Sequence, residues 1–400
     1  MILKYELRKI IKKRINRILI LLIILASLIL SVFAIGSFRF VDKNGKTHNG
    51  IYASRNLIEE KNRWKGELTG KSINKIIKMA NIADSKEHKV EHPDIIYGQE
   101  VQSYTDIIDS STKMLYGEHG MDDKTESIKT ASPREINKIY DRYRENLKKS
   151  SEEYGDTSQK RAYIMNKYRK IKTPMYYEAP DAWDTMLLYV EPLSLILLLI
   201  ISFITAGIFV EEFRYKADSV FFSSVFGKSK AIKYKVLAGI IMTTVLYWFG
   251  IGLLSMICFG VMGTSGVNTM YQFSQPYAIY TVTFGQMYWI SIMCGYIASL
   301  LSSSISMLIA SKSKSIAVSI GVPVILFGVL PFVTRILPFK ILALMPAGLN
   351  NILNNAKIPY VFQVGGTAFS QIGFMMAFYL AIAAILSPFT YICYKRVAVK

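Results

Sequence analysis

The sequence predicts an all-α polytopic membrane protein, and the distribution of its charged residues is the main reason. No charged residue occurs from Val236 to Ser311. Four further runs are also uncharged: Ile18–Phe38, Pro192–Val210, Ser315–Thr334 and Ile358–Tyr394. A transmembrane helix needs about 20 predominantly apolar residues, and these runs are long enough to supply them. A soluble domain would not tolerate so long an uncharged stretch, so the 51% of apolar residues indicates membrane helices rather than one large core.

We expect six transmembrane helices, which cover residues 18–37, 186–210, 236–261, 288–310, 315–334 and 371–394. The segments that flank or connect them cover 1–17, 38–185, 211–235, 262–287, 311–314, 335–370 and 395–400. Small residues such as Gly239, Gly250 and Gly295 favour close packing of the helices, although a substrate pathway would also use them. Pro323 and Pro331 predict a kink in the fifth helix.

The net charge of +19 belongs to the membrane part of the chain. Residues 41–185 hold 26 basic and 24 acidic residues, whereas the remainder holds 22 basic and 5 acidic residues. Basic loops mark the cytoplasmic side of a membrane protein. We therefore expect four cytoplasmic segments, at 1–17, 211–235, 311–314 and 395–400. Segment 38–185 is then extracellular, both termini are cytoplasmic, and the positive charge gives no reason to expect a nucleic-acid partner.

Residues 1–17 predict an amphipathic helix at the membrane surface, because basic and apolar residues alternate at helical spacing. The basic residues expected to contact lipid headgroups include Arg8, Lys12, Lys13, Arg14 and Arg17. This segment leads directly into the first transmembrane helix, so it resembles an elbow rather than a cleaved signal peptide.

The extracellular segment predicts a mostly helical domain. Apolar residues recur at helical spacing over 56–83, and Ser132-Pro133-Arg134-Glu135 predicts the start of a helix that runs to about Tyr154. Residues 84–131 give no clear pattern. The segment contains no cysteine, since Cys258, Cys294 and Cys393 all lie in predicted membrane helices. The domain must therefore fold without disulfides, as is typical of a Gram-positive bacterial surface.

One short motif in this domain allows a metal-site hypothesis. His88-Lys-Val-Glu-His92 matches the H-x-x-E-H pattern of a group of zinc proteases. That pattern needs both imidazoles on one continuous helix, and Pro93 disfavours the helical conformation at His92. A solvated polar loop is the alternative, and we favour it over a metal site.

The loop at 211–235 carries the most informative pattern. Phe221, Phe222, Val225 and Phe226 are spaced so that they fall on one face of a helix, which Asp218 or Ser219 would begin and Gly227, in a left-handed conformation, would end. Four lysines follow: Lys228, Lys230, Lys233 and Lys235. We expect this helix to dock into a groove on a cytoplasmic partner; the alternative is a helix that lies on the lipid surface.

Gly227-Lys228-Ser229 looks like the end of a phosphate-binding P-loop, but Phe222 stands where that motif requires glycine. We therefore expect no nucleotide hydrolysis, no cofactor and no catalytic residue in this chain.

Two features near the outer membrane boundary remain. Segment 335–370 is too apolar for a free loop and too short to span, which predicts a helix that dips back into the outer leaflet. Glu191-Pro192 stands near the expected outer start of the second membrane helix, where the carboxylate would serve either as a helix cap or in function.

Together these features resemble the ABC-2 class of ABC transporter permeases. The resemblance covers about 1–40 and 186–400: a basic elbow, six spans, a Leu342-x-x-Met-Pro stretch, and a loop with Glu, an apolar helix, Gly-Lys and a final Lys. The loop departs from the class where Val225-Phe226 replaces a frequent proline. The large domain between the first two spans resembles that of Firmicute permeases linked to antimicrobial-peptide export or self-immunity.

This resemblance implies a membrane subunit of an exporter in a bacterial plasma membrane, which binds a separate ATPase subunit and pairs with a second permease. The implied ATPase-docking residues are Glu211, Glu212, Phe221, Phe222, Val225, Phe226, Gly227, Lys228 and Lys235. ATP would be bound by the partner, and the substrate would be hydrophobic or amphipathic, an antimicrobial peptide being one candidate. The alternative is a membrane-anchored sensor or scaffold whose outer domain binds a peptide or envelope ligand.

Overall fold

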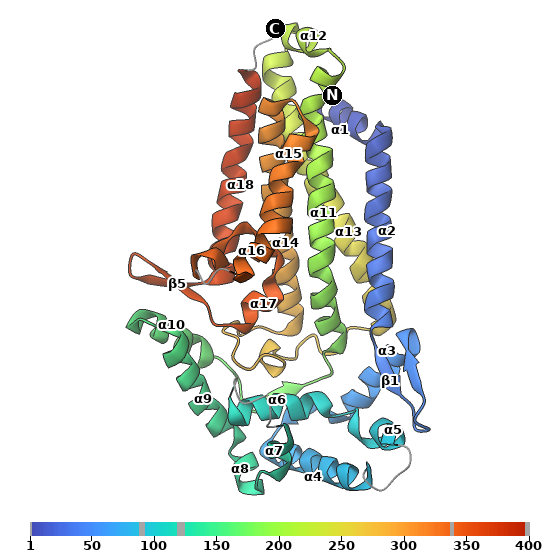
Figure 1. Ribbon diagram of the computed structural model, residues 1–400, viewed down its shortest axis with the longest axis vertical. Coiled ribbons are helices and arrows are strands. Elements are labelled where there is room, and N and C mark those ends of the chain that lie inside the picture. Colours follow the sequence, from blue (N-terminus) through green and yellow to red (C-terminus); the bar gives the residue numbers. More distant parts are fainter. Residues whose placement is uncertain (1, 88–92, 118–124, 337–339, 397–400) are drawn as a thin grey trace.

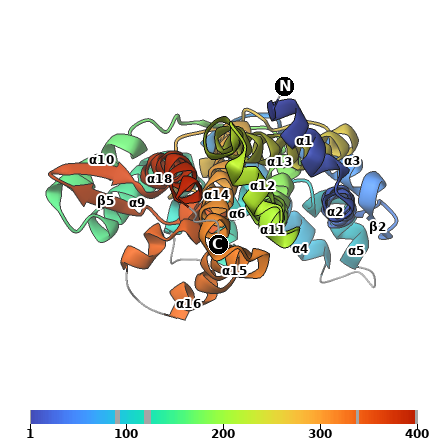
Figure 2. The ribbon, with the colours of Figure 1, turned by 90° about the horizontal axis from the view of Figure 1, so that it is seen from above.

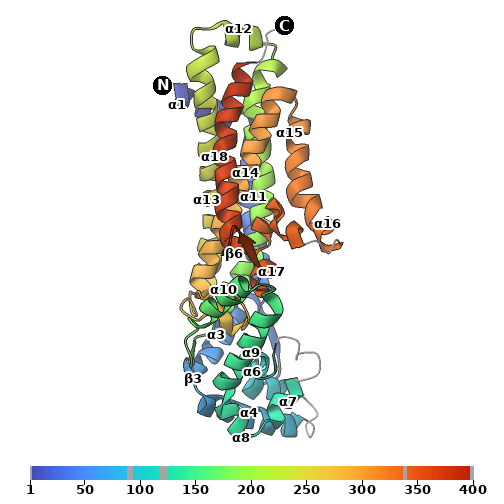
Figure 3. The same cartoon turned by 90° about the vertical axis from the view of Figure 1, so that its left-hand side faces the viewer.

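The computed structural model describes residues 2–87, 93–117, 125–336 and 340–396. It is a helical bundle with a separate helical domain at one end (Figure 1). Both termini and the short helix α12 (Asp218–Ser223) lie at the opposite end of the bundle (Figures 1 and 3). His88 and His92 fall outside the described residues.

Six helical stretches among the described residues are long and apolar enough to cross a membrane, so the prediction of a multi-pass membrane protein is confirmed. They are α2 (Arg14–Gly36), α11 (Asp181–Arg214), α13 (Ile232–Met262) with the preceding π-helical η4 (Gly227–Ala231), α14 (Phe284–Ser313), Ile316–Val333, and α18 (Gln371–Lys395). α11 and α14 are the most buried of these and form the centre of the bundle.

The membrane helices pack closely where the sequence places small residues. Gly295 lies against Tyr247 and Ser194, and a Cβ added at Gly295 would collide with both side chains. Tyr247 donates a hydrogen bond to the carbonyl oxygen of Ile292 at 2.7 Å, and the Ser202 and Ser302 hydroxyls are 2.6 Å apart. These contacts support packing as the role of the small residues.

The N-terminal segment forms helix α1 (Ile2–Lys12), which ends where Lys13 adopts an extended conformation before α2 begins. The Asn16 side chain donates to the carbonyl oxygen of Ile10 at 2.8 Å and holds this bend. α1 lies across the bundle axis rather than along it (Figure 2).

The fifth membrane stretch is interrupted as the prolines predict. It consists of α15 (Ile316–Pro323), the π-helical η6 (Val324–Val329) and α16 (Leu330–Ile336). A proline nitrogen cannot donate the usual helical hydrogen bond, and wider π-helical turns accommodate that loss.

The domain at the far end is mostly helical, with two short antiparallel strand pairs. Its elements are β1 (Arg39–Val41), β2 (Thr47–Asn49), α3 (Gly50–Lys61), η1 (Asn62–Trp64), β3 (Gly66–Leu68), α4 (Gly70–Glu87), α5 (Pro93–Ile96), η2 (Tyr97–Val101), α6 (Thr105–Tyr116), α7 (Thr125–Thr130), α8 (Pro133–Asn137), α9 (Ile139–Tyr154), α10 (Ser158–Tyr168) and β4 (Met175–Tyr177). β1 pairs with β2 so that Phe40 faces His48, and β3 pairs with β4 so that Glu67 faces Tyr176.

Two of the helix predictions for this domain need correction. The helical spacing over 56–83 covers parts of two helices, because β3 separates α3 from α4 where Gly66 adopts a φ of +138°. The helix start at Ser132 is confirmed by a capping box with Glu135, but the helix divides at Lys138 into α8 and α9.

Segment 262–287 is part of the domain at the far end, which we call the outer domain, rather than a free loop. Phe273 is the last residue of η5 (Tyr271–Phe273), and Tyr277 follows four residues later. Both are buried in the apolar core of α4, α6, α9 and α10. Tyr143 of α9 donates a hydrogen bond to the carbonyl oxygen of Pro276, and Ser110 of α6 donates to that of Phe273 at 2.6 Å. The outer core is thus completed by residues from between α13 and α14.

Segment 335–370 does not form one helix, and its entry into the outer leaflet stays a prediction. The described part of this segment forms η7 (Lys340–Leu344), η8 (Pro346–Asn350), α17 (Ile352–Lys357) and the hairpin β5 (Val361–Val364)–β6 (Thr367–Ser370). η8 packs on α14 and α18. Glu191, ten residues inside α11 rather than at its start, accepts a hydrogen bond from the Leu353 N–H at 2.7 Å and caps α17.

Candidate functional site

The candidate site is the loop between α11 and α13, at the end of the bundle that holds both termini (Figure 1). Helix α12 ends at Ser223, earlier than the sequence predicts, and turns lead into η4. Gly227 does not adopt the predicted left-handed conformation. Glycine is needed there for a different reason, since a Cβ would collide with the carbonyl oxygen of Phe221.

The four apolar side chains of the loop do not share one face, so that part of the prediction is wrong. Phe222 is buried, with its ring centroid 5.3 Å from that of Tyr394, and Phe221 packs edge-on against it. Val225 and Phe226 follow the end of α12 and point outward, with exposed fractions of 89% and 48%. Val225 and Phe226 are therefore the most accessible of the four to a partner.

A buried ion cluster anchors the loop to the bundle; we call it the inner cluster and define it as Lys235, Glu212, Glu6, Lys9 and Glu211. Lys235 is fully buried, and its Nζ lies 2.7 Å from Glu212 Oε1 and 3.6 Å from Glu6 Oε2. Burying a lysine costs free energy unless carboxylates and hydrogen bonds compensate it. Here a third partner, the carbonyl oxygen of Ile208, accepts from Nζ at 3.1 Å.

Lys9 of α1 extends the inner cluster. Its Nζ lies 3.2 Å from Glu211 Oε2 and 3.1 Å from Glu212 Oε1. Burial acts to lower the pKa of Lys9, but the carboxylates of Glu212 and Glu211 outweigh it and raise that pKa above the usual lysine value. Tyr394 of α18 donates to Glu212 Oε2 at 3.3 Å. The inner cluster therefore ties α1, α11, α13 and α18 together beside α12.

These contacts divide the predicted docking residues into two groups. Glu212, Phe222, Gly227 and Lys235 are buried within the chain, and Glu211 and Phe221 are half-buried. The exposed residues are Val225, Phe226 and Lys228, together with Val220, which is 72% exposed. We call these four residues the loop tip.

Sequence reasoning missed three members of the site. Glu6 carried a usable signal, since it is the only acidic residue before Asp42. Lys9 was one of several similar basic residues in the first segment, and nothing in the sequence places Tyr394 next to Glu212.

The basic residues expected at the membrane surface are mostly accessible. Arg8, Lys12, Arg14 and Arg17 are exposed, whereas Lys13 is half-buried with its Nζ 3.9 Å from Glu211 Oε1. Their contact with lipid headgroups stays a prediction.

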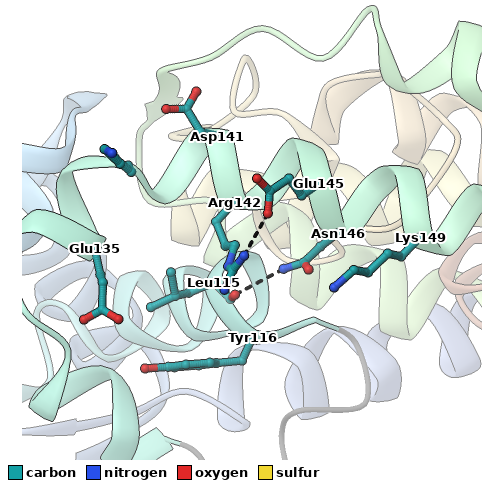
Figure 4. A pocket seen from close by; sticks show the side chains of 9 residues that line it. Leu115, Tyr116, Glu135, Asp141, Arg142, Glu145, Asn146 and Lys149 are labelled. Atoms are coloured by element: carbon teal, nitrogen blue, oxygen red, sulfur yellow. Dashed lines mark hydrogen bonds and ion pairs between the residues drawn. The ribbon is translucent and has the colours of Figure 1, made fainter.

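The outer domain holds a pocket of about 360 Å³ between α6, α8 and α9 (Figure 4). Arg142 Nη1 is 2.8 Å from Glu145 Oε2, and Asn146 donates to the carbonyl oxygens of Met114 and Leu115 at 3.0 and 3.1 Å. The charges that line it have both signs, and the arginine is neutralised by a neighbour on its own helix. The lining therefore favours no ligand of a particular charge.

A second buried lysine joins the outer domain to the bundle. Together with the residues that it contacts, it forms what we call the outer cluster, which consists of Lys61, Asp181, Asp106 and Tyr177. Lys61 Nζ lies 2.6 Å from Asp181 Oδ1 and 3.3 Å from Asp106 Oδ2, which also accepts from the Tyr177 hydroxyl at 2.8 Å. Burial raises the pKa of the Asp106 carboxyl above its ordinary value. This cluster fixes α3 and α6 to the start of α11.

Comparisons of the chain with protein-family models, with curated proteins and with solved structures found no match. The functional assignment therefore depends on the sequence pattern and on the geometry of the loop.

Proposed function

We propose that this chain is the membrane-spanning subunit of an ABC-2 type exporter in a bacterial plasma membrane, and that its loop tip docks into a cytoplasmic ATPase subunit. The observation that carries the proposal is an exposed apolar tip held on a buried ionic anchor. Isolated exposed apolar residues are common on proteins, but Val225 and Phe226 project beside basic residues from a loop that the inner cluster ties to the bundle.

The inner cluster supports a route by which docking would act on the bundle. A push on the loop tip reaches α11 and α13 through the chain itself. It reaches α1 and α18 through Lys9 and Tyr394, which both contact Glu212. Closure of the ATPase on ATP would in this way move four membrane helices together, and no residue of this chain needs to take part in covalent chemistry.

The exported substrate would be hydrophobic or amphipathic, and the pathway would form between two permease subunits. The apolar surface of the fifth membrane stretch supports a lipid or protein neighbour there, since Val324, Ile325 and Val329 are all exposed. An antimicrobial peptide remains one candidate substrate through the resemblance of the outer domain.

The docking proposal is tested by Val225→Ser/Phe226→Ser in a strain that co-expresses the ABC ATPase encoded nearest to this gene. Truncating one central apolar anchor of an interface typically costs about 2 kcal/mol or more, which is roughly a 30-fold loss of affinity. We expect the ATPase to be lost on co-purification and transport to stop, while the thermal unfolding of the purified permease stays at the wild-type value.

A matched control is Ile51→Ser/Ile82→Ser, which removes two similarly exposed apolar side chains from the outer domain and should keep the ATPase. Lys228→Gln should weaken binding less and only at low salt. Phe222→Ala is expected to lower thermal stability first, because Phe222 is buried. If the Val225/Phe226 variant keeps its ATPase at the wild-type level, the docking role is wrong, and a sensor or scaffold function becomes the better account.

Orientation is tested separately in a cysteine-free variant of the chain. Ser158→Cys lies on the outer domain and Ser223→Cys on the loop, and both positions are exposed. We expect an impermeant thiol reagent to label Ser158→Cys in intact cells and Ser223→Cys only after lysis. The reverse pattern would contradict cytoplasmic termini.

A further inference from the structure

A groove of about 520 Å³ lies between α13 and α18, near the end of the bundle that carries the loop. The two helices contact each other there (Figure 3). The lining residues that matter to the argument are Lys230, Lys233, Leu237, Ile240, Pro388 and Tyr391.

The groove combines two kinds of surface along its length. Lys230 and Lys233 stand at the loop end, where α13 begins, and both side chains are exposed. Leu237 and Ile240 follow one and two turns deeper along α13, inside a stretch apolar enough to cross a membrane. The positive charges therefore lie at the level of the membrane surface, and the apolar floor of the groove extends toward the membrane interior.

Among the described residues, no ion pair joins a carboxylate to Lys230 or Lys233, so both lysines are available to a ligand. Glu6, Glu211 and Glu212 at this end of the bundle pair with Lys9, Lys13 and Lys235 instead. Lys230 Nζ lies 4.9 Å from the centroid of the Phe226 ring, which orients it without neutralising it.

We propose that this groove binds one anionic phospholipid of the inner leaflet, with the phosphate between Lys230 and Lys233 and one acyl chain along Leu237, Ile240 and Tyr391. Basic pockets between membrane helices on the cytoplasmic side suit anionic headgroups. A second copy of the chain fits poorly, because a two-fold interface would bring each lysine pair against its own copy. A soluble partner fits poorly because the floor lies at membrane depth.

A bound lipid would steady the start of α13 and therefore the base of the loop tip. This inference does not need the proposed transport function, but it rests on the proposed cytoplasmic orientation of this end of the bundle.

The test uses the full chain in detergent after delipidation, with phosphatidylglycerol and phosphatidylcholine of identical acyl chains as probes and native mass spectrometry as the readout. We expect wild-type protein to retain phosphatidylglycerol preferentially. Lys230→Gln/Lys233→Gln should weaken phosphatidylglycerol binding roughly tenfold or more and leave phosphatidylcholine binding unchanged.

Two further variants make the result specific to the groove. Lys228→Gln/Lys312→Gln removes two exposed lysines at the same end of the bundle that do not line the groove, and it should keep the wild-type preference. Leu237→Trp fills the floor and keeps both lysines, and it should also weaken binding.

Three outcomes would overturn the proposal. Equal loss in both double lysine variants would show diffuse surface attraction, and equal retention of the two lipids would show an unselective apolar crevice. A dimer that dissociates in Leu237→Trp would show that a second copy covers the groove.

Discussion

The two ends of α11 each hold a buried lysine between two carboxylates, yet the two clusters are built differently. In the inner cluster, Glu212 of α11 has two lysine partners, Lys235 at 2.7 Å and Lys9 at 3.1 Å. In the outer cluster, one lysine, Lys61, serves both Asp181 and Asp106. Glu212 therefore has a spare lysine donor, whereas Asp181 and Asp106 share one lysine.

This difference bears on movement. A carboxylate with two lysine partners keeps one ion pair if the other is pulled away, so the inner cluster can rearrange without leaving Glu212 unpaired. The outer cluster has no second lysine in contact among the described residues, and Asp181 Oδ2 is buried without a hydrogen-bond partner. The inner end is therefore suited to a loop that shifts, and the outer end to a fixed joint.

The largest effect is expected from Lys235→Ala. It removes the fully buried cation and leaves Glu6 and Glu212 with less compensation, and breaking a buried ion pair costs about 3–5 kcal/mol. The measurement is thermal unfolding of the purified chain in detergent. Lys235→Ala/Glu212→Ala should recover part of the loss, because the uncompensated carboxylate is gone. Wild-type stability of the single variant would contradict this account.

Lys61→Ala should cost less, about 2 kcal/mol, because the Asp106 side chain keeps 22% exposure, against 6% for Glu212, and water can reach it. Limited proteolysis of the full chain, read at sites in the outer domain, reports the loosened joint together with thermal unfolding. A loss larger than that of Lys235→Ala would reverse the comparison between the two clusters.

Tyr394→Phe and Tyr177→Phe each remove one hydroxyl donor to a clustered carboxylate. A hydrogen bond to a charged group contributes about 1.5–3 kcal/mol. Tyr394→Phe should fall below that range, since Lys9 and Lys235 still donate to Glu212, whereas Tyr177→Phe should fall within it. Equal melting temperatures for the two variants would show that spare donors make no difference.

The smallest effect is expected at Glu135, an exposed carboxylate that serves as a reference for the buried ones. Its hydrogen bonds with Ser132 hold its pKa below the ordinary value of 4.5. A carboxyl group whose pKa is lower in the folded state contributes stability that is complete above its unfolded-state pKa. That stability is lost as the pH falls through its folded-state pKa. Ser132→Ala should therefore reduce the loss of stability between about pH 5 and pH 3. An unchanged acid profile would count against the capping box.

The sequence predicts the membrane architecture well, because charge is excluded from a bilayer whatever the neighbouring helices do. It predicts the loop only in part. The spacing of Phe221, Phe222, Val225 and Phe226 assumes one continuous helix, but the helix ends at Ser223 and Gly227 lies close to the Phe221 carbonyl. Residues on distant helices decide which side chains are buried, and local periodicity does not contain that information.

The same limit applies to the lysines. Lys228 and Lys235 look alike in the sequence, yet Lys228 is exposed and Lys235 is fully buried. What separates them is the position of Glu6 and Glu212, which lie far away in the chain and meet Lys235 only after the helices assemble.

The insertion of Phe273 and Tyr277 into the outer core has a consequence for chimeric proteins. The outer domain is connected by the chain to α2 and α11, and its core is completed by residues between α13 and α14. If residues 38–185 alone were exchanged, the new domain would have to pack around Phe273 and Tyr277 of the original chain. Its core would then lack the two aromatic side chains that fit it. A chimera can therefore acquire the specificity of this domain only if residues 262–287 are exchanged together with residues 38–185.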